Sequence, residues 1–350
     1  MNRNTRWGAF LLAGMMIAAS IIVATATAKP TKKAASIKVC VLLPDTKSSA
    51  RYELFDRPYL AKAFKAAGVP ATINNAQGDA QKQRSQADSC LTNGAKVILL
   101  DQLDPASGAA ITNAAVAGGA KVIDYDRLVV GSKASYYVSF DNVGVGKLQG
   151  KGLAAALKSK PGAVVVELNG GITDNNAKLF KKGYDSILNP LYKSGKLKKG
   201  VAGDQWTDWD PVKGQAIFEQ MLTRNHNNIQ GVLSANDGLA GAVVAALKAH
   251  GLKPVALTGQ DATPTGVQFI IAGWQTGTVY KSVKKEAAAA AATAIAIING
   301  TAVKTTGKVS GTPSVLLTPT WVTKANVSLL YKDGFVKKSQ VCKGEYKKYC

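Results

Sequence analysis

The stretch "IKVCVLL" (residues 37–43) is a continuous apolar run rich in β-branched residues. A run without alternating polar residues is typical of a strand that is covered on both faces. A helical pattern follows in "YLAKAFKAAG" (59–68), which ends on the glycine that commonly closes a helix. This part of the chain therefore predicts a parallel sheet with helices on its two faces.

The same alternation continues along the chain in two similar halves. Strand patterns appear in "AKVILLD" (95–101) and "AKVIDYD" (120–126), and again in "GAVVVELNG" (162–170) and "IQGVLSAND" (229–237). Helical patterns separate them, which builds βαβ units and a parallel sheet in each half. The predicted fold class is α/β, with two doubly wound, Rossmann-like lobes.

The segment after residue 262 is too short for a third domain, so we expect it to complete the two sheets already begun. The predicted lobes are an N-terminal one of residues 36–140 and 263–318 and a C-terminal one of residues 141–262 and 319–336, followed by a basic, cysteine-containing tail at 337–350. The chain must then cross between the lobes more than once. Several linkers form a hinge, and two such sheets can close on a ligand bound at the carboxyl ends of their strands.

The first 28 residues have the pattern of a secretory signal peptide. "MNRNTR" is cationic, "WGAFLLAGMMIAASIIV" is apolar, and "ATATA" supplies small residues for cleavage after Ala28. An uncleaved membrane anchor is the alternative, because the apolar run is long. We therefore expect an exported protein, located in the periplasm or outside the cell.

The chain is strongly basic, with 44 Lys and Arg against 22 Asp and Glu and a formal net charge of +22. Such a balance is common in nucleic-acid-binding proteins. The lysines are spaced in small groups, however, as in "KSGKLKK" (193–199), and no nucleic-acid module accompanies them. We expect a solvated basic surface without a nucleic-acid partner, and such a surface favours contact with anionic membranes or cell-wall polymers.

Four cysteines are available for disulfides in an exported protein. Cys342 and Cys350 lie in the polar tail "VCKGEYKKYC", where a short local bridge is expected. Cys40 and Cys90 are then left either as a second bridge or as two buried free thiols. No CxxC motif is present, so we expect no metal site and no cofactor.

Polar and aromatic residues follow nearly every predicted strand at its carboxyl end, where the strands of a parallel sheet bring their ends together. The candidate ligand-binding residues are Arg51, Tyr52, Asp126, Arg127, Asp174, Asn176, Trp209, Asn236, Asp261 and Lys281. A sugar needs this mixture, because each hydroxyl both donates and accepts a hydrogen bond and the C–H faces of the ring need an aromatic cover. Charged partners strengthen these bonds.

Each of these residues also has a purely structural interpretation. Asp174 and Asn236 stand where helix N-caps are common, and Trp206 and Trp209 could pack within a lobe. Arg51 and Lys281 could be surface charges. The functional interpretation depends on the whole set, because its members fall at the same end of their strands.

Several motifs are similar to those of the periplasmic sugar-binding proteins of type I fold, the solute-binding components of bacterial ABC importers, and most closely to the D-xylose-binding members. The matching motifs are "YDR" (125–127), "DNNAKLF" (174–180), "GDQW" (203–206), "AND" (235–237), "GQDA" (259–262) and "TVYK" (278–281). The resemblance covers residues 37 to 335 and implies that the sugar is held between the two lobes.

Carried across by motif, the resemblance implies a role for each candidate residue. Arg51, Asp126 and Arg127 would come from the first lobe, and Asp174, Asn176, Trp209 and Asn236 from the other. Asp261 would lie at a lobe crossing and Lys281 would return from the first lobe. The crossings are expected near residues 140–141, 260–261 and 318–319. In the first loop the family has a tryptophan after the arginine, whereas Tyr52 follows here, so either Tyr52 or Phe55 covers the second sugar face.

The predicted function is capture of a monosaccharide, D-xylose or a related pentose or hexose, and its delivery to an ABC transporter permease by a monomeric protein. No catalytic residues are predicted. A carbohydrate-processing enzyme is the alternative, although "GVGKLQG" lacks dinucleotide-loop spacing and a Ser-His-Asp site is hard to build from His226 and His250. A sugar sensor that presents its ligand to a membrane receptor is a further alternative. A DNA regulator is disfavoured, because no helix-turn-helix precedes Ile37.

Overall fold

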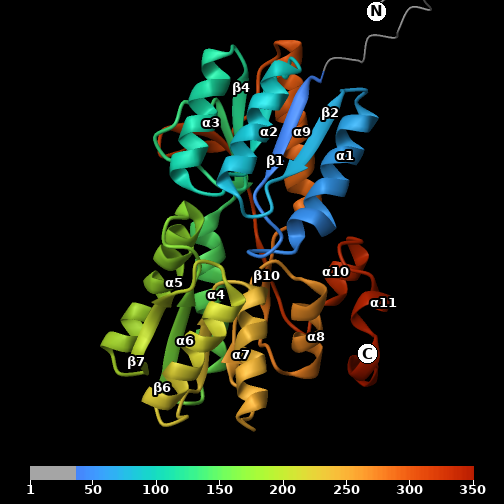
Figure 1. Ribbon diagram of the computed structural model, residues 1–350. Helices are drawn as coiled ribbons and strands as arrows, with labels where there is room; N and C mark the ends of the chain where they lie inside the picture. Colours follow the sequence, from blue (N-terminus) through green and yellow to red (C-terminus); the bar gives the residue numbers. More distant parts are fainter. Residues whose placement is uncertain (1–36) are drawn as a thin grey trace, which may run out of the picture. The chain divides into compact units, whose positions relative to one another are not determined.

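The computed structural model describes residues 37–350, in which helices cover the faces of two separate parallel sheets (Figure 1). The predicted fold class, α/β with two doubly wound lobes, is confirmed. The expected signal segment at 1–28 lies outside the described residues. Along residues 37–350, no helix combines the length and the apolar character that crossing a membrane requires.

The first lobe is built on a seven-stranded sheet with the order β11-β12-β5-β4-β3-β1-β2. Its strands are β1 (Val39–Leu43), β2 (Ala71–Asn75), β3 (Val97–Leu100), β4 (Lys121–Tyr125), β5 (Tyr136–Phe140), β11 (Gly307–Val309) and β12 (Thr312–Leu317). Neighbours run parallel except β11 and β12, which are antiparallel. The apolar run at 37–43 supplies β1, which is fully buried.

Helices on both faces of this sheet explain why β1 carries no polar alternation. Val39, Val41 and Leu43 pack toward α1 (Arg57–Ala66) and α9 (Val283–Asn299). Cys40 and Leu42 point the other way, toward α2 (Ala80–Thr92) and α3 (Pro105–Ala117). A short π-helical turn, η1 (Tyr52–Asp56), precedes α1.

The second lobe has a parallel four-stranded sheet with the order β7-β6-β8-β9. Its strands are β6 (Ala163–Asn169), β7 (Leu197–Trp206), β8 (Gly231–Ser234) and β9 (Ala256–Leu257). Helices α4 (Asn142–Ala156) and α5 (Asn175–Lys193) cover one face, and α6 (Pro211–Arg224) and α7 (Asp237–Ala249) cover the other. Each face therefore has a core of its own.

The chain passes from one lobe to the other in short segments. It leaves β5 at Asp141, returns between β10 (Thr278–Tyr280) and α9, and passes again between β12 and β13 (Thr320–Val322). β10 and β13 pair with each other in a two-stranded sheet. This arrangement gives the junction several strands, as the sequence predicted.

The predicted lobe boundary at residue 263, and the crossing expected at 260–261, differ from the structure. Helix α8 (Pro264–Ala272) packs on α7, and its Phe269 is buried in the core of the second lobe. The carboxylate of Asp237 accepts hydrogen bonds from the backbone N–H of Thr263 (2.8 Å) and the hydroxyl of Thr278 (2.8 Å). Residues 263–280 therefore stay with the second lobe, and the chain crosses at Lys281–Ser282.

The C-terminal segment is packed against the second lobe. It forms α10 (Ser328–Lys332), α11 (Lys338–Val341) and a 3-10 turn, η2 (Gly344–Tyr349). Val341 is fully buried, and its carbonyl accepts a hydrogen bond from Gln268 of α8 (3.0 Å). Disulfides join Cys342 to Cys350 within this segment and Cys40 of β1 to Cys90 of α2.

Candidate functional site

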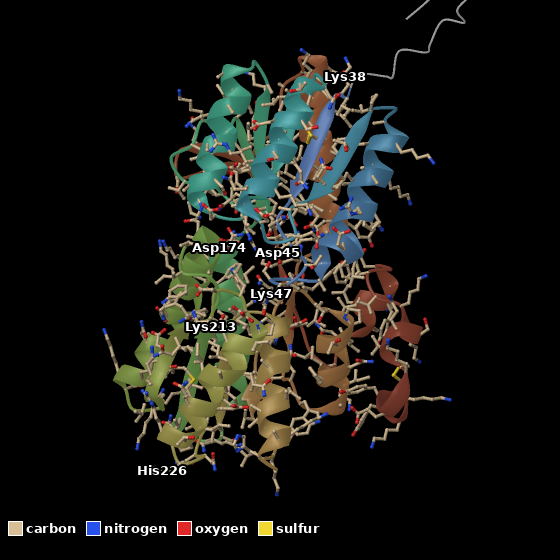
Figure 2. The ribbon with its side chains drawn as sticks, in the orientation of Figure 1. Lys38, Asp45, Lys47, Asp174, Lys213 and His226 are labelled. Atoms are coloured by element: carbon tan, nitrogen blue, oxygen red, sulfur yellow. A yellow bond between two sulfur atoms is a disulfide. The ribbon has the colours of Figure 1, made fainter. Side chains whose placement is uncertain are left out.

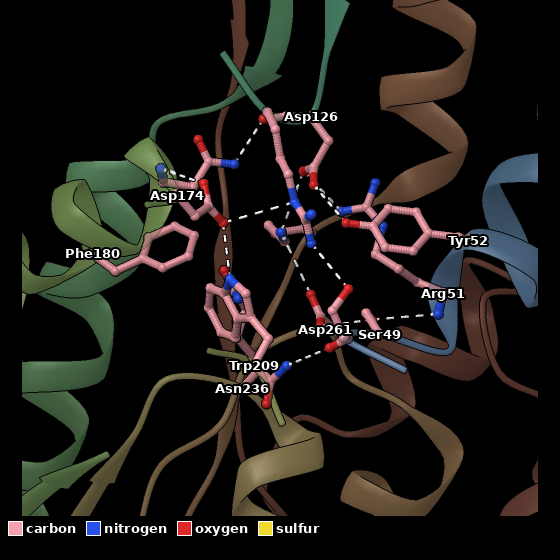
Figure 3. Close-up of a pocket in the computed structure, with 14 residues that line it drawn as sticks. Ser49, Arg51, Tyr52, Asp126, Asp174, Phe180, Trp209, Asn236 and Asp261 are labelled. Atoms are coloured by element: carbon pink, nitrogen blue, oxygen red, sulfur yellow. Dashed lines mark hydrogen bonds and ion pairs between the residues drawn. The ribbon is translucent and has the colours of Figure 1, made fainter. Parts of the chain in front are cut away.

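A pocket lies between the lobes, where the carboxyl ends of their strands meet (Figure 3). Its empty space is about 300 Å³, including its opening to solvent. Its lining residues are Ser48, Ser49, Arg51, Tyr52, Asp126, Arg127, Asp174, Asn176, Phe180, Trp209, Asn236, Gln260, Asp261 and Lys281. The pocket therefore contains every candidate residue predicted from the sequence.

Arg51 enters the pocket at the start of η1 and is almost completely buried. Its guanidinium donates to both oxygens of Asp56 (3.0 and 2.7 Å) and to Glu286 (2.6 Å) behind it. The remaining nitrogen, Nη1, donates to Asp126 on the pocket side (3.1 Å). Burial alone would lower the pKa of Arg51, but the carboxylates around it raise that pKa well above its usual range. Arg51 is thus a fixed cation.

Asp126 follows β4 in a left-handed backbone conformation, with a φ of 58°. Its carbonyl oxygen accepts three hydrogen bonds, from Tyr137 (2.9 Å), Ser139 (2.9 Å) and Asn176 (2.7 Å), which hold this turn in place. Its carboxylate lies near Arg51 and 3.6 Å from Lys281. Burial opposes ionisation, but these cations hold the pKa of Asp126 well below its usual range. The pocket therefore contains a stable carboxylate acceptor.

Arg127, the next residue, has weaker partners. Its Nη2 donates to the hydroxyl of Ser48 (3.0 Å), while its Nε lies 3.7 Å from Asp101 and 3.8 Å from Asp174. The guanidinium also lies 5.7 Å from the centroid of the Tyr52 ring. Those ion pairs are longer than hydrogen bonds, so donors of Arg127 remain available to a ligand.

Trp209 supplies a ring on the side of the second lobe. Its indole Nε1 donates to Asp174 (3.0 Å), the N-cap residue of α5. A Cβ at Gly170 would collide with the indole, so the glycine pair of "LNGG" lets the ring lie against the backbone. Phe180 meets the same ring edge-on, with centroids 6.3 Å apart. The ring orientation is thus fixed from both sides.

Asn236, Asp261 and Lys281 complete the lower wall of the pocket. Asn236 caps α7 through its Oδ1 and donates from Nδ2 to the carbonyl of Ser48 in the other lobe (3.1 Å). Asp261 has a φ of 95° and accepts from the hydroxyl of Ser49 (3.1 Å). Burial would lower the pKa of Lys281, but Asp126 and Asp261 raise it. From the sequence, helix capping and ligand contact were alternative roles for Asn236. In the structure the same side chain both caps α7 and lines the pocket.

The structure resolves which aromatic residues face the pocket. Tyr52 lines it, whereas Phe55 turns away and stacks on Phe335, with centroids 4.2 Å apart. Trp206 is absent from the lining and packs against the core of the second lobe. The pocket thus presents Tyr52 from one lobe and Trp209 with Phe180 from the other.

Some pocket residues escaped the sequence analysis. Phe180 stands one helical turn after Asn176, and that spacing was a usable signal. Ser48, Ser49 and Gln260 gave none, because small polar residues in loops are ordinary. Asp56 and Glu286 were also missed: they hold Arg51 from behind, and Glu286 comes from α9, far away in sequence.

Comparison with known proteins agrees with this geometry. The sequence profile of the periplasmic binding protein domain matches residues 39–302. The chain is 38% identical to the D-xylose-binding periplasmic protein of Escherichia coli, over 82% of this chain and 87% of that protein. It is 34% identical to the multiple sugar-binding periplasmic receptor ChvE of Rhizobium radiobacter, over 85% of this chain and 90% of the relative.

Solved structures resemble it as well. An ABC transporter solute-binding protein from Clostridium phytofermentans with bound β-D-glucose matches with a TM-score of 0.81 and 26% identity, over 87% of this chain and 99% of that one. A carbohydrate transporter solute-binding protein from Chloroflexus aurantiacus in complex with D-glucose matches with a TM-score of 0.81 and 28% identity, over 87% and 98%. The resemblance noted in the motifs is confirmed, and the chain is a binding protein rather than an enzyme. It belongs to the family of periplasmic binding proteins.

Proposed function

We propose that this protein captures a neutral monosaccharide between its lobes and delivers it to an ABC transporter permease in the cytoplasmic membrane. The observation that carries the proposal is the pocket itself. It combines ionised acceptors such as Asp126, fixed donors such as Arg51, and rings from both lobes within about 300 Å³. That combination matches the hydroxyl rim and the C–H faces of one sugar ring.

Delivery to a permease requires that the protein closes mainly when the ligand is bound. A sugar that contacts both lobes stabilises the closed arrangement, because an open one offers it only half of these partners. D-xylose or a related pentose or hexose is the proposed ligand, in keeping with the named specificities of the relatives.

The proposed location is outside the cytoplasmic membrane, with residues 1–28 as the export signal. Two disulfides suit such an oxidising compartment. We further propose that the protein works as a monomer, because the pocket is complete within one chain.

A thermal-shift screen of the mature protein against pentoses and hexoses, followed by titration calorimetry, tests the proposal. We expect at least one sugar to raise the melting temperature by several degrees and to bind with 1:1 stoichiometry. Recovery of that sugar unchanged after prolonged incubation is expected of a binding protein. The absence of a shift with every sugar would remove the proposal.

A further inference from the structure

A second cavity adjoins the sugar pocket and has no part in the function proposed above. It encloses about 650 Å³, including its opening to solvent, and we call it the outer recess. Arg127, Asp174 and Trp209 line both cavities, so the recess begins where the pocket ends. Beyond them its walls include Asp45, Gln102 and Leu103. In Figure 2, Asp45 and Asp174 lie at the level where the two lobes meet.

The boundary between pocket and recess has one unbonded pair, which lies between the hydrogen bonds from Arg127 to Ser48 (3.0 Å) and from Trp209 to Asp174 (3.0 Å). Arg127 Nε and Asp174 Oδ2 lie 3.8 Å apart, too far for a hydrogen bond. A third cavity also borders the pocket at Ser48, Asn236 and Asp261, and hydrogen bonds close that wall: Asn236 to Ser48 (3.1 Å) and Ser49 to Asp261 (3.1 Å). A ligand substituent can therefore reach the outer recess between Arg127 and Asp174, which no hydrogen bond joins.

Gln102 indicates that the outer recess is made for polar groups. Its side chain is 1% exposed, and its Oε1 has no hydrogen-bond partner among residues 37–350. Beside it, neither carboxylate oxygen of the buried Asp101 has a hydrogen-bond partner within the described part of the chain. A buried acceptor without a partner costs free energy, and Gln102, which lines the recess, gains a partner when its amide turns toward a ligand hydroxyl.

The remaining walls suit a second sugar ring. Leu103 and the Trp209 indole offer apolar surface for C–H groups, while Gln102 and Arg127 offer hydrogen-bonding groups. The charges also select the ligand: Asp45, Asp174 and Asp208 line the recess against the single cation of Arg127 among its lining residues. A neutral glycosyl group fits this balance, whereas a uronate would meet carboxylates.

We propose that the outer recess is a second glycosyl subsite, so that the protein also takes neutral disaccharides whose first ring occupies the sugar pocket. This inference rests on the proposed function. Pro105, Thr173 and Asp208 at its rim are exposed, so the far end of the second ring can lie in solvent.

Calorimetry tests the subsite with the best monosaccharide from the screen and with neutral disaccharides that carry the same sugar as their non-reducing or reducing ring. We expect at least one disaccharide to bind the wild type within tenfold of the monosaccharide. Leu103→Trp, which fills the recess, and Gln102→Leu, which removes the amide, should each weaken that disaccharide at least tenfold and change monosaccharide affinity less than twofold.

Leu54→Trp is the matched control, because Leu54 is exposed and lines the third cavity but neither the pocket nor the outer recess. It should leave both affinities unchanged. Binding of the monosaccharide without any disaccharide overturns the subsite and leaves the proposed function standing. Equal loss of disaccharide affinity in Leu54→Trp and Leu103→Trp also overturns it. If no sugar binds at all, the proposed function fails first and the subsite with it.

Discussion

The carboxylate and the backbone of Asp126 have different tasks. The backbone carbonyl gathers three hydrogen bonds and fixes the turn after β4, while the side chain faces Arg51 and Lys281. A change confined to the charge of the side chain should therefore leave the turn intact and alter only the pocket. Because these two roles are separate, a substitution of the Asp126 side chain tests ligand recognition without disturbing the turn.

Asp126→Asn should weaken sugar binding about 100-fold, roughly 3 kcal/mol, because two buried cations lose a counter-charge and the ligand loses a charged acceptor. Titration calorimetry measures the change. Asp79→Asn is the control, since Asp79 caps α2 and does not line the pocket. Equal affinity for Asp126→Asn and the wild type would remove this carboxylate from the binding site.

Asp124, near the end of the same strand, should affect the stability of the fold rather than ligand binding. It is fully buried; its Oδ2 accepts one hydrogen bond, from the N–H of Val129 (2.9 Å), and its Oδ1 has no partner in residues 37–350. Burial raises the pKa of Asp124 to about 8. In the unfolded chain its pKa is about 3.9, so between pH 4 and pH 8 the folded protein keeps a proton that the unfolded chain has lost.

Stability should therefore fall as the pH rises from 4 to 8, by up to about 5 kcal/mol from this group. Asp124→Asn imitates the protonated form and should lose less stability over that range. Urea midpoints at pH 5, 7 and 9 measure the difference, with Asp141→Asn, at an exposed helix cap, as the control. Parallel pH profiles for Asp124→Asn and the wild type would show that Asp124 is already ionised when folded.

At this scale the sequence predicted the pocket residues at strand ends, because a parallel sheet fixes where those ends lie. It could not predict the residues that hold them. Asp56 stands five residues after Arg51, but only the uncommon π-helical turn η1 brings the two together, and Glu286 reaches Arg51 from α9, far away in sequence. The choice between Tyr52 and Phe55 likewise depended on Phe335, because Phe335 stacks on the ring of Phe55 and holds that ring away from the pocket.

Among the helices, α4 and α5 approach each other most closely at two glycines. A Cβ at Gly183 of α5 would collide with the carbonyl oxygen of Val143, and one at Gly146 of α4 with that of Phe180. Both obstacles are backbone atoms, which cannot move as a flexible side chain can. Because Asp174 and Asn176 stand at the start of α5, the position of this helix also sets the pocket.

Gly183→Ala should destabilise the protein by about 2 kcal/mol or more, since the helices must separate, and should also weaken sugar binding. Gly241→Ala in α7 is the matched control, because its new Cβ would meet a side-chain atom of Phe269 at an ordinary 3.6 Å. There the better helix propensity of alanine should stabilise by up to about 1 kcal/mol. Thermal unfolding measures the stability of both variants, and calorimetry measures their sugar affinity. Similar stability for Gly183→Ala and Gly241→Ala would show that the close contact between α4 and α5 does not require glycine at residue 183.

The elements themselves were largely predictable, because continuous apolar runs and helical spacing mark βαβ units regardless of the lobe. Their assignment to lobes was less so. Helix α8 and strand β10 show the same alternation as any other unit, and the packing of α8 on α7 together with the hydrogen bonds from Thr263 and Thr278 to Asp237 holds them on the second lobe. Hydrophobic periodicity indicates that an element is buried, but it does not indicate which of the two sheets the element packs against.

On the scale of the whole protein, direct hydrogen bonds between the lobes set how easily the closed form is reached. The hydroxyl of Tyr137, from β5 of the first lobe, lies among polar groups of the second. It accepts a hydrogen bond from Asn142 Nδ2 of the second lobe (3.0 Å), while its single proton is donated to the carbonyl of Asp126 in its own lobe (2.9 Å). An exposed ion pair between Lys47 and Asp210 (2.7 Å) also joins the lobes. The Asn142–Tyr137 hydrogen bond and the Lys47–Asp210 ion pair stabilise closure, and neither Tyr137 nor Lys47 lines the pocket.

Tyr137→Phe should therefore weaken sugar binding about five- to tenfold, since closure loses a buried hydrogen bond of about 1 kcal/mol. Tyr137 does not line the pocket, but phenylalanine also removes one of the three hydrogen bonds to the Asp126 carbonyl, so the measurement that reports on closure is the scattering of the ligand-free protein. Small-angle X-ray scattering should show a larger radius of gyration for the ligand-free variant than for the ligand-free wild type. At saturating sugar the two radii should agree.

Lys47→Met provides the comparison, because it removes an inter-lobe contact that is exposed and screened by salt. Its effect on affinity should stay below about threefold and vanish at high ionic strength, whereas the effect of Tyr137→Phe should persist. If Tyr137→Phe binds sugar as the wild type does and scatters identically without ligand, the buried bond has no part in closure. The equilibrium between open and closed forms would then depend on the ligand contacts alone.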